Sequence, residues 1–149
     1  MSFDAPAIRD LQQIIELWSR TYNEAAKPDW SHLLPYYDEH IHFVDSVQEI
    51  HGITAFREMV ERLTARSGEL RMAILNAAKD GSTIFIECEM TILFRNTRRS
   101  VLHGASRLRL NEHGKIVEQR DYYDLWGDIL DNIPGVNRLY RAFMRKVFG

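Results

Sequence analysis

The architecture of this chain is best approached from one stretch near its C-terminal end, Lys115-Ile-Val-Glu-Gln-Arg-Asp-Tyr-Tyr-Asp-Leu125. The stretch follows a tight turn at 111–114, and its apolar and polar side chains alternate as they do in a half-buried β-strand. Because successive side chains of a strand point to opposite faces, four of them share the more apolar face: Val117, Gln119, Asp121 and Tyr123. A carboxylate beside a tyrosine on such a face is what a proton-transfer pocket needs, and an ordinary edge strand can look the same.

Three similar stretches precede this strand. The four strand candidates cover residues 70–78, 82–94, 101–110 and 116–125. Their connections at 79–82, 95–100 and 111–114 are short enough for hairpins, so the strands are expected to form an antiparallel meander.

The first half of the chain has helical periodicity instead. The predicted elements are helices at about 7–26, 30–38 and 53–65, a strand at 41–45, a connection at 46–52, and a final helix at about 137–147. Helices followed by a meander predict an α+β fold, in which a cone-shaped, curved antiparallel sheet wraps around N-terminal helices and a C-terminal helix follows. The open end of such a cone is where a small-molecule site is expected.

Composition restricts the class of protein. At 149 residues and 45% hydrophobic content, the chain is expected to fold as a single domain, residues 1–149, around one core. A formal net charge of -2 gives no reason to expect nucleic acid or an anionic membrane as a partner. The single cysteine, Cys88, excludes an internal disulfide, and no leader-like or membrane-spanning stretch is found, so a cytoplasmic protein is expected.

A second candidate carboxylate, Asp45, ends the strand at 41–45 and shares a face with Ile41 and Phe43. If it points into the apolar interior, its neutral form is favoured, and it could act as a general base near neutral pH. The alternative is that Asp45 caps the connection that begins at Ser46. Both interpretations stay open.

With these residues in this order, the sequence resembles a SnoaL-like member of the nuclear transport factor 2-like superfamily. The segments that carry the resemblance are 18–22, 40–52, 87–106 and 120–125. The resemblance implies a cone-shaped α+β barrel that binds a small apolar ligand. It places Asp121 on the aspartate that activates water in limonene-1,2-epoxide hydrolases, and Asp45 on the proton-shuttling aspartate of ketosteroid isomerases. The superfamily also contains cyclases and non-catalytic binders, so the fold does not fix the reaction.

Two departures from the family pattern bear on the reaction. An ungapped comparison puts Glu87 where the epoxide hydrolases have an arginine, and Asp45 where they have an asparagine that helps to hold the water. A glutamate cannot donate a hydrogen bond to a developing oxyanion unless it is protonated. The oxyanion-hole positions of the isomerases fall near Thr21 and at Ser106, and Tyr22 is one residue from the first, about 100° around a helix.

The pairing of the 82–94 strand decides which of its faces lies inside the cone. If Phe94 pairs with Val101, Glu89 lies opposite Ser106 and both face inward, and this is the register that we expect. A one-residue slip would turn the whole strand over and bury its unbroken apolar even-numbered set instead. In the expected register that apolar set lies outside, where it would serve a sheet-to-sheet homodimer.

Besides Asp121 and Asp45, the residues expected to line the cavity are Trp18, Tyr22, Phe43, Glu89, Ser106, Gln119, Tyr123 and Trp126. Two kinds of function fit them. One is an isomerase, cyclase or hydrolase in which Asp121 or Asp45 moves a proton or activates water, and the other is a non-catalytic ligand-binding or dimeric interaction module. No phosphate loop, nucleophile elbow or nucleotide fingerprint occurs, so no cofactor is expected.

Two features outside the cone have plainer interpretations. His40 and His42 share a strand face, but a closed metal site needs three or four ligands, so no metal is expected. The basic, amphipathic segment 136–149 is expected to pack over the sheet or the pocket mouth with its charges in water, in preference to lying on a membrane.

Overall fold

The computed structural model describes residues 5–25, 27–94, 98–129 and 133–149. Its centre is one curved, six-stranded sheet with the strand order β2-β1-β6-β5-β4-β3. The strands are β1 (Tyr37–Val44), β2 (Glu49–His51), β3 (Ser67–Asp80), β4 (Thr83–Phe94), β5 (Ser100–Leu110) and β6 (Ile116–Tyr123). Strands β3 to β6 form the predicted antiparallel meander, and β1 joins β6 in parallel. Strands β2 and β3 are the two edges, so the described sheet is open.

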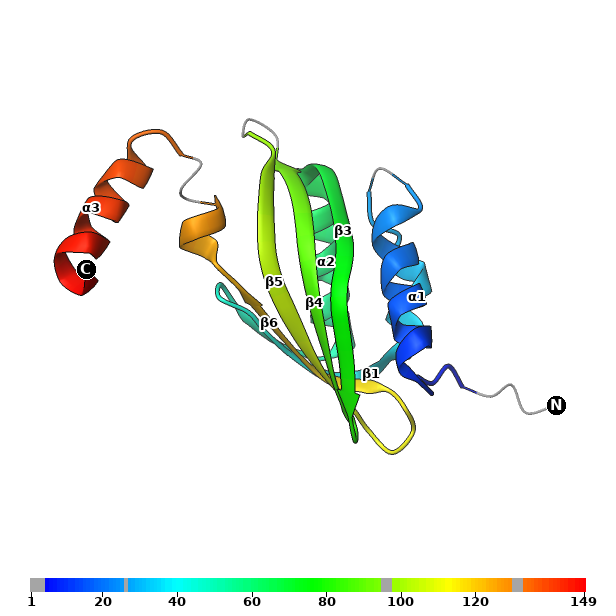
Figure 1. Cartoon of the computed structure of the whole chain (residues 1–149). Coiled ribbons are helices and arrows are strands. Elements are labelled where there is room, and N and C mark those ends of the chain that lie inside the picture. The colour runs from blue at the N-terminus through cyan, green and yellow to red at the C-terminus, as the bar shows by residue number, and fades with distance from the viewer. Residues whose placement is uncertain (1–4, 26, 95–97, 130–132) are drawn as a thin grey trace.

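Two helices cover the concave side of the sheet, α1 (Leu11–Asn23) and α2 (Ile53–Arg66), as Figure 1 shows. The buried residues of α1 recur at helical spacing: Ile14, Trp18, Thr21 and Tyr22. Ala26, the expected end of this helix, lies outside the described residues. Two 3-10 turns, η1 (Trp30–His32) and η2 (Leu34–Tyr36), stand where one short helix was expected over 30–38. The α+β architecture predicted from the sequence is confirmed.

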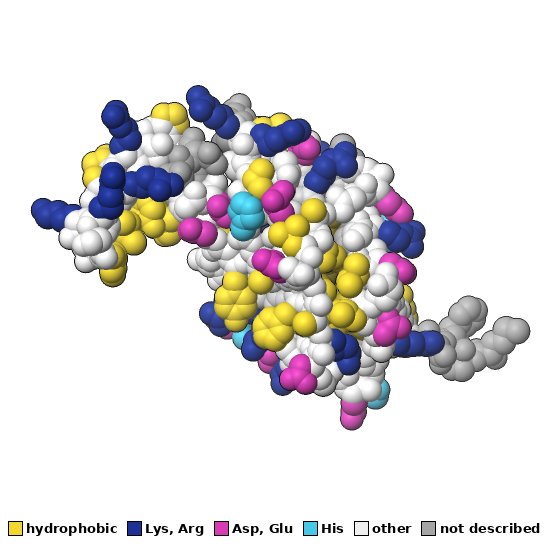
Figure 2. Space-filling model, in the orientation of Figure 1, with side chains coloured by type: hydrophobic (Ala, Val, Ile, Leu, Met, Phe, Trp, Pro, Cys, Tyr) yellow, Lys and Arg dark blue, Asp and Glu magenta, His cyan; other side chains and the backbone are white. Residues whose placement is uncertain are grey.

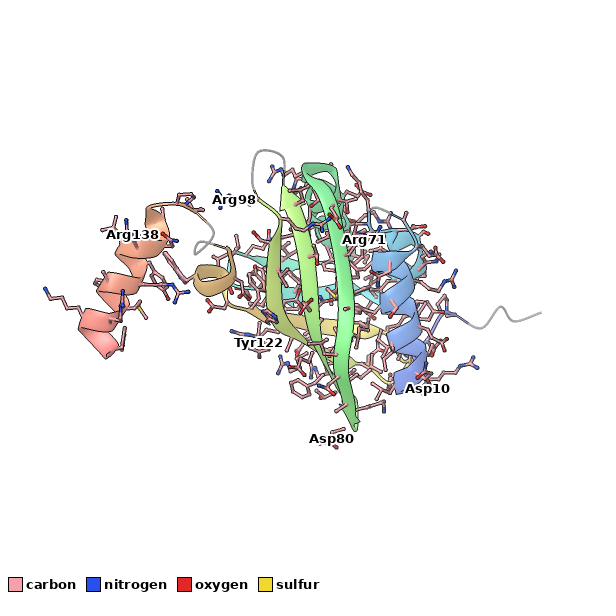
Figure 3. The ribbon with its side chains drawn as sticks, turned by 45° about the horizontal axis from the view of Figure 1, so that its top comes forward. Asp10, Arg71, Asp80, Arg98, Tyr122 and Arg138 are labelled. Carbon is pink, nitrogen blue, oxygen red and sulfur yellow. The ribbon has the colours of Figure 1, made fainter. Side chains whose placement is uncertain are left out.

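The start of α1 is fixed by a contact with the turn between β5 and β6. Ile8 is buried, and its amide donates to the carbonyl oxygen of Gly114 at 2.8 Å. Gly114 has φ +72°, and a Cβ there would lie 2.8 Å from the Ile8 carbonyl oxygen, so glycine is what allows this close approach. The helix begins at Leu11, after this contact, and not at residue 7 as expected. Asp10, labelled in Figure 3, caps it, and its carboxylate accepts from the Gln13 amide.

An aromatic cluster holds α2 against the sheet. Phe56 of α2 is 1% exposed, and its ring centroid lies 4.7 Å from that of Tyr37 and 5.5 Å from that of Phe43, both on β1. The ring of Trp30 in η1 meets Phe56 edge-on at 6.3 Å. Tilted and edge-on pairs of this kind stabilise a core beyond the area that they bury. The cluster therefore fixes one wall of the interior.

Strand β4 turns its even-numbered side chains into the core, so the expected register is wrong. Ile86 pairs with Ser106, and Glu89 pairs with His103 on the outer face. The buried residues of the strand are Ile84, Ile86, Cys88 and Ile92. Burying this apolar set is favourable, whereas burying the glutamates would remove unpaired charges from water at a large cost. Residues 95–97 of the expected hairpin lie outside the described residues.

The C-terminal part of the chain stands apart from the sheet. After β6 come a π-helical turn, η3 (Leu125–Ile129), and α3 (Val136–Phe148). Figure 1 shows α3 projecting from the body, and its side chains Leu139 and Phe143 are 76% and 61% exposed. The expectation that this helix packs over the sheet or the pocket mouth is therefore wrong. Among the described residues, the cavity is lined mainly by α2 and the sheet, with Tyr22 of α1, and by no residue of α3.

Among the residues that the structure describes, no helix combines the length and the apolar character needed to cross a membrane.

Candidate active site

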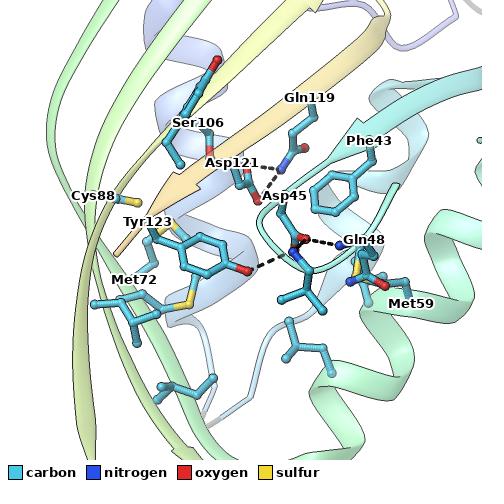
Figure 4. A pocket seen from close by; sticks show the side chains of 18 of the residues that line it. Phe43, Asp45, Gln48, Met59, Met72, Cys88, Ser106, Gln119, Asp121 and Tyr123 are labelled. Atoms are coloured by element: carbon cyan, nitrogen blue, oxygen red, sulfur yellow. Dashed lines mark hydrogen bonds between the residues drawn. The ribbon is translucent and has the colours of Figure 1, made fainter. Parts of the chain in front are cut away.

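A cavity of about 460 Å³ lies between α2 and the concave face of the sheet (Figure 4). Its walls are mostly apolar, with Met59 and Leu63 from α2, Met72 from β3, and Cys88 and Met90 from β4. The polar side chains among its lining residues include Tyr22, Asp45, Gln48, Ser106, Gln119, Asp121 and Tyr123. A cavity of this size and character suits a small organic molecule that is oriented by a few polar contacts.

Neutral donors hold Asp121 on the cavity wall. Ser106 lies opposite it on β5, and the serine hydroxyl donates to Asp121 Oδ1 at 2.6 Å. Gln119 Nε2 lies 2.9 Å from Oδ1 and 3.2 Å from Oδ2. The Tyr37 hydroxyl donates to Gln119 Oε1 at 2.5 Å, which turns the amide nitrogen toward Asp121. Because Oδ1 receives the two shorter bonds, Oδ2 is the oxygen with a lone pair left for a ligand.

Burial has the largest effect on the acidity of Asp121. Its carboxyl group is removed from bulk water, and this raises its pKa from 3.8 to about 6. The hydrogen bonds from Ser106 and Gln119 act in the opposite direction because they favour the carboxylate, while the charge of Asp45 raises the pKa further. Asp121 can therefore take up and release a proton near neutral pH.

Asp45 follows β1 and faces the same cavity, but its carboxylate also belongs to a turn. Its Oδ1 accepts from the amides of Val47 and Gln48, each at 2.8 Å. The Tyr123 hydroxyl donates to Oδ2 at 3.3 Å. Asp45 therefore caps the connection, as one interpretation had it, and it also lines the cavity. Burial, followed by the charge of Asp45, raises the pKa of Tyr123, so this hydroxyl stays protonated.

Tyr22 of α1 also lines the cavity. No group within the described part of the chain forms a hydrogen bond with the Tyr22 hydroxyl, although the ring lies in the aromatic core. Burial and then the charge of Asp121 raise its pKa well above the ordinary value, so the group remains a donor. Thr21, nearer to the isomerase oxyanion position in the sequence comparison, uses its hydroxyl on the Leu17 carbonyl oxygen instead. The sequence marked Tyr22 as a lining residue, but it gave no sign that the hydroxyl would be free.

Four other expected residues, Phe43, Ser106, Gln119 and Tyr123, line the cavity, and three do not. Trp18 is buried one turn before Tyr22, where its indole N–H donates to Met72 Sδ at 2.7 Å in the core between α1 and β3. Trp126 is half exposed and stacks on Tyr140 of α3, with ring centroids 5.3 Å apart. Glu89 lies outside the cone, 3.4 Å from the His103 ring nitrogen, because of the register of β4.

Several residues of the site were not among those expected. The side chains that α2 contributes come from the face of the helix that the periodicity already predicts to be buried, so their pattern was a usable signal. Cys88 is different, because it faces the cavity as a result of the β4 register. Burial raises the pKa of this thiol to about 11, with the charge of Asp121 adding to the effect, so it is a neutral wall residue and not a nucleophile.

Comparison with known structures agrees with this fold. A hypothetical protein from Catenulispora acidiphila with a ketosteroid isomerase-like fold, in complex with trimethylamine, superposes with a TM-score of 0.72 at 16% identity, covering 86% of this chain and 98% of that one. A Jannaschia protein assigned as a SnoaL-like polyketide cyclase gives 0.69 at 15% identity, covering 87% and 99%. An LEH-like epoxide hydrolase from M. tuberculosis gives 0.66 at 16% identity, covering 88% and 97%. Identities this low show a shared fold and leave the activity open.

The search among curated proteins finds no match for this sequence. The SnoaL-like domain model does match, over residues 10–119, which includes α1, α2 and the sheet up to Gln119 of β6. Asp121 and Tyr123 follow directly after the matched segment on the same strand. Because the match spans well over half of the sequence, this chain belongs to the family of SnoaL-like domains.

Proposed function

We propose that the protein binds a small, mostly apolar molecule in the cavity and catalyses a proton transfer on it, with Asp121 as the general base and then the general acid. The observation that carries this proposal is a carboxyl group with a pKa of about 6 on the wall of a mostly apolar cavity. A catalytic base works best when its pKa lies near the working pH, because it is then both ionised and able to hold a proton.

A C–H bond next to a carbonyl group is the substrate feature that fits this arrangement. Asp121 Oδ2 takes the proton, and the free Tyr22 hydroxyl donates to the carbonyl oxygen on which negative charge develops. The carboxyl then returns the proton to another carbon, which is an isomerisation. Alternatively, the enolate carbon attacks a second carbonyl of the same molecule, and the alkoxide oxygen formed there takes the proton from Asp121, which is a cyclisation. The SnoaL-like polyketide cyclase among the structural neighbours supports this class of reaction.

Hydrolytic opening of an epoxide fits less well, although the LEH-like neighbour makes it a candidate. Glu87, at the position of the expected arginine, faces outward and accepts a hydrogen bond from Asn76 at 2.6 Å. The arginines that line the cavity, Arg62 and Arg66, come from the end of α2 and are exposed. Neither forms an ion pair with Asp121 in the described part of the chain.

The alternative is a binding protein that uses the cavity without chemistry. The hydrogen bonds of the site favour it, because Ser106 and Gln119 both donate to the Asp121 carboxyl and not into the open space. In that case, a ligand would be held by the apolar walls and by the Tyr22 hydroxyl. Replacement of Asp121 would then change the affinity for the ligand, and there would be no catalytic activity for it to abolish.

We also propose that two copies associate through the outer face of the sheet. The even-numbered residues of β4 cannot form this interface, because they lie in the core. Figure 2 shows apolar side chains among charged ones over the strands of this face. The exposed large apolar residues of β3 to β6 are Leu75, Phe85, Val101 and Tyr122. Light scattering at micromolar concentration should give a dimer, and Phe85→Lys should give a monomer. A monomeric mass for the unaltered protein would contradict this.

A base-sensitive probe tests the catalytic proposal without knowledge of the natural substrate. An activated benzisoxazole opens its ring when a base removes its C–H proton, leaving a phenolate oxygen. The protein should accelerate this reaction, with a rate that rises through about pH 6, and Asp121→Asn should lower the rate by about 10²-fold or more. Asp80→Asn, at the exposed tip of β3 (Figure 3), is the matched control. Saturable probe binding with equal rates in all three proteins would support the binding function instead.

A further inference from the structure

The hairpin of β1 and β2 gathers three metal-binding side chains on the outer face of the sheet. His42 and His51 are directly paired across the two strands, and Glu49 lies two residues before His51. Glu49 Oε1 is 2.8 Å from His42 Nε2 and 3.5 Å from His51 Nε2. The two imidazole rings are nearly parallel, with centroids 4.4 Å apart and an angle of 7° between their planes. All three donor atoms lie within 4.8 Å of one another.

We propose that His42, Glu49 and His51 form a binding site for a divalent transition metal ion of the zinc type. Imidazole nitrogen and carboxylate oxygen are ligands that zinc accepts together, and three protein ligands leave a fourth position for water. Zinc bonds of about 2.0–2.1 Å in a tetrahedron place the ligand atoms about 3.4 Å apart. The separations of 2.8 and 3.5 Å are already close to this value. Because the rings are stacked, each would have to turn about its Cβ–Cγ bond for both nitrogens to bind one ion.

His40 and His42 share a strand face in the sequence, but only His42 belongs to this group, because β2 pairs beside it. The His40 side chain is 85% exposed, and its ring nitrogen lies 3.4 Å from the carboxylate of the adjacent Glu39. His42 gains its partners from β2, an element that the sequence pattern did not reveal. The pairing of β1 with β2 therefore brings His51 and Glu49 beside His42, which gives three ligands.

A second group of similar residues, Glu24, Asp29 and His32, is less suited to a metal ion. Arg20 already forms an ion pair with Glu24 at 3.0 Å, and this positive charge would oppose a cation. Asp29 uses one carboxylate oxygen to accept from the Ser31 amide. The hairpin group is the one whose donors converge on a single carboxylate oxygen.

The hairpin site is linked to the cavity through the turn that joins its strands. Residues 45–48 form this turn, with the Asp45 amide bonded to the Gln48 carbonyl oxygen at 3.0 Å. Asp45 and Gln48 both line the cavity. A metal ion that bonds to residues on both strands fixes the separation of the strands and so holds the turn. Bound metal is therefore expected to stabilise the mouth of the cavity from the outer face.

Titration calorimetry with zinc chloride, on protein without a polyhistidine tag, tests the site. We expect one equivalent to bind, and His51→Ala to weaken the affinity by more than about tenfold, since even loss of residues that only support metal ligands costs that much. His40→Ala is the matched control, because it removes an exposed histidine of the same hairpin that lies outside the group, and it should leave the affinity unchanged. Magnesium should not bind, because it prefers an all-oxygen octahedron.

Thermal unfolding gives a second measurement. Zinc should raise the Tm of the unaltered protein and of His40→Ala, and it should leave the Tm of His51→Ala unchanged. If His51→Ala does not fold, Glu49→Gln replaces it, since that side chain is exposed and keeps its size. Equal zinc affinity in the unaltered protein and in the site variants would overturn the proposal, as would an equal loss in the His40 control.

Discussion

Replacing Asp121 with asparagine should make the protein more stable above pH 6, although it removes the proposed catalytic group. Asparagine has nearly the same shape and keeps an oxygen that accepts from Ser106, so the main change is the loss of a buried charge. Burial raises the pKa of Asp121 in the folded state, so the folded protein binds this proton more tightly than the unfolded chain does. The stability that comes from the protonated group is complete below pH 3.8 and is lost as the pH rises through about 6.

The structure sets the size of this effect. A pKa that rises from 3.8 to about 6 corresponds to about 3 kcal/mol at 1.36 kcal/mol for each pH unit. By the same relation, about 1 kcal/mol of the penalty is already present at pH 4.5. The advantage of Asp121→Asn over the unaltered protein should therefore be about 2 kcal/mol larger at pH 8 than at pH 4.5. Weaker hydrogen bonds to the asparagine oxygen act equally at both pH values, so they leave this difference unchanged.

Urea unfolding followed by tryptophan fluorescence at the two pH values measures this difference. Asp80→Asn, which removes an exposed carboxylate, should stay within about 0.5 kcal/mol of the unaltered protein at both. A difference between Asp121→Asn and the unaltered protein that does not change with pH would refute the reasoning, because the carboxyl would then titrate alike in the folded and unfolded states. A destabilised variant at pH 8 would refute it as well.

Three further predictions concern the cavity and its walls. Tyr22→Phe should change the free energy of unfolding by less than about 1 kcal/mol, since its hydroxyl has no partner in the described structure, but it should slow benzisoxazole opening by about 10²-fold, because the phenolate oxygen loses its donor. Phe56→Ala should cost about 3–5 kcal/mol in urea unfolding, whereas Phe143→Ala on the exposed α3 should cost less than about 0.5 kcal/mol. Cys88 should react with iodoacetamide at pH 8 much more slowly than free cysteine, because its pKa is about 11, and an equal rate would show that the thiol is open to solvent.

Hydrophobic periodicity predicted the helices and strands whose buried residues recur at regular spacing along the chain. The helix expected over 53–65 is Ile53–Arg66, and the strand expected over 101–110 is Ser100–Leu110. Strand β2 was not predicted because it has only three residues, and both of its ends are polar. It forms because it pairs with β1 across the turn at Asp45. An element of this kind depends on its partner, and hydrophobic periodicity does not record a partner.

The face of β4 shows which sequence signal was the stronger one. Its alternation of apolar and acidic residues favoured burial of the even-numbered set, and the structure has that arrangement. An assumed hairpin register and an assumed dimer face led to the opposite choice for Glu89. Burial of a continuous apolar set adds the favourable free energies of several side chains. A hairpin register inferred from loop length rests on a single local feature, so it is the weaker signal.

The site itself was partly accessible from the sequence. Strand parity placed Asp121 with Gln119 and Tyr123, and these three do share the cavity. The hydrogen bond that orients Gln119 was not accessible, because it comes from Tyr37, 82 residues away. The free hydroxyl of Tyr22 was equally hidden, since it depends on how α1 lies against the sheet.

The two cavity aspartates differ in their partners, and this difference assigns their roles. Asp45 accepts two backbone amides of its own turn, so its carboxylate is fixed in place. Asp121 accepts from a hydroxyl and an amide side chain, which can bond to either protonation state, and burial brings its pKa to about 6. Asp45 is thus suited to shape the cavity and to raise the pKa of its neighbour by its charge. In the proposed reaction, Asp121 is the carboxyl that changes its protonation while its surroundings stay in place.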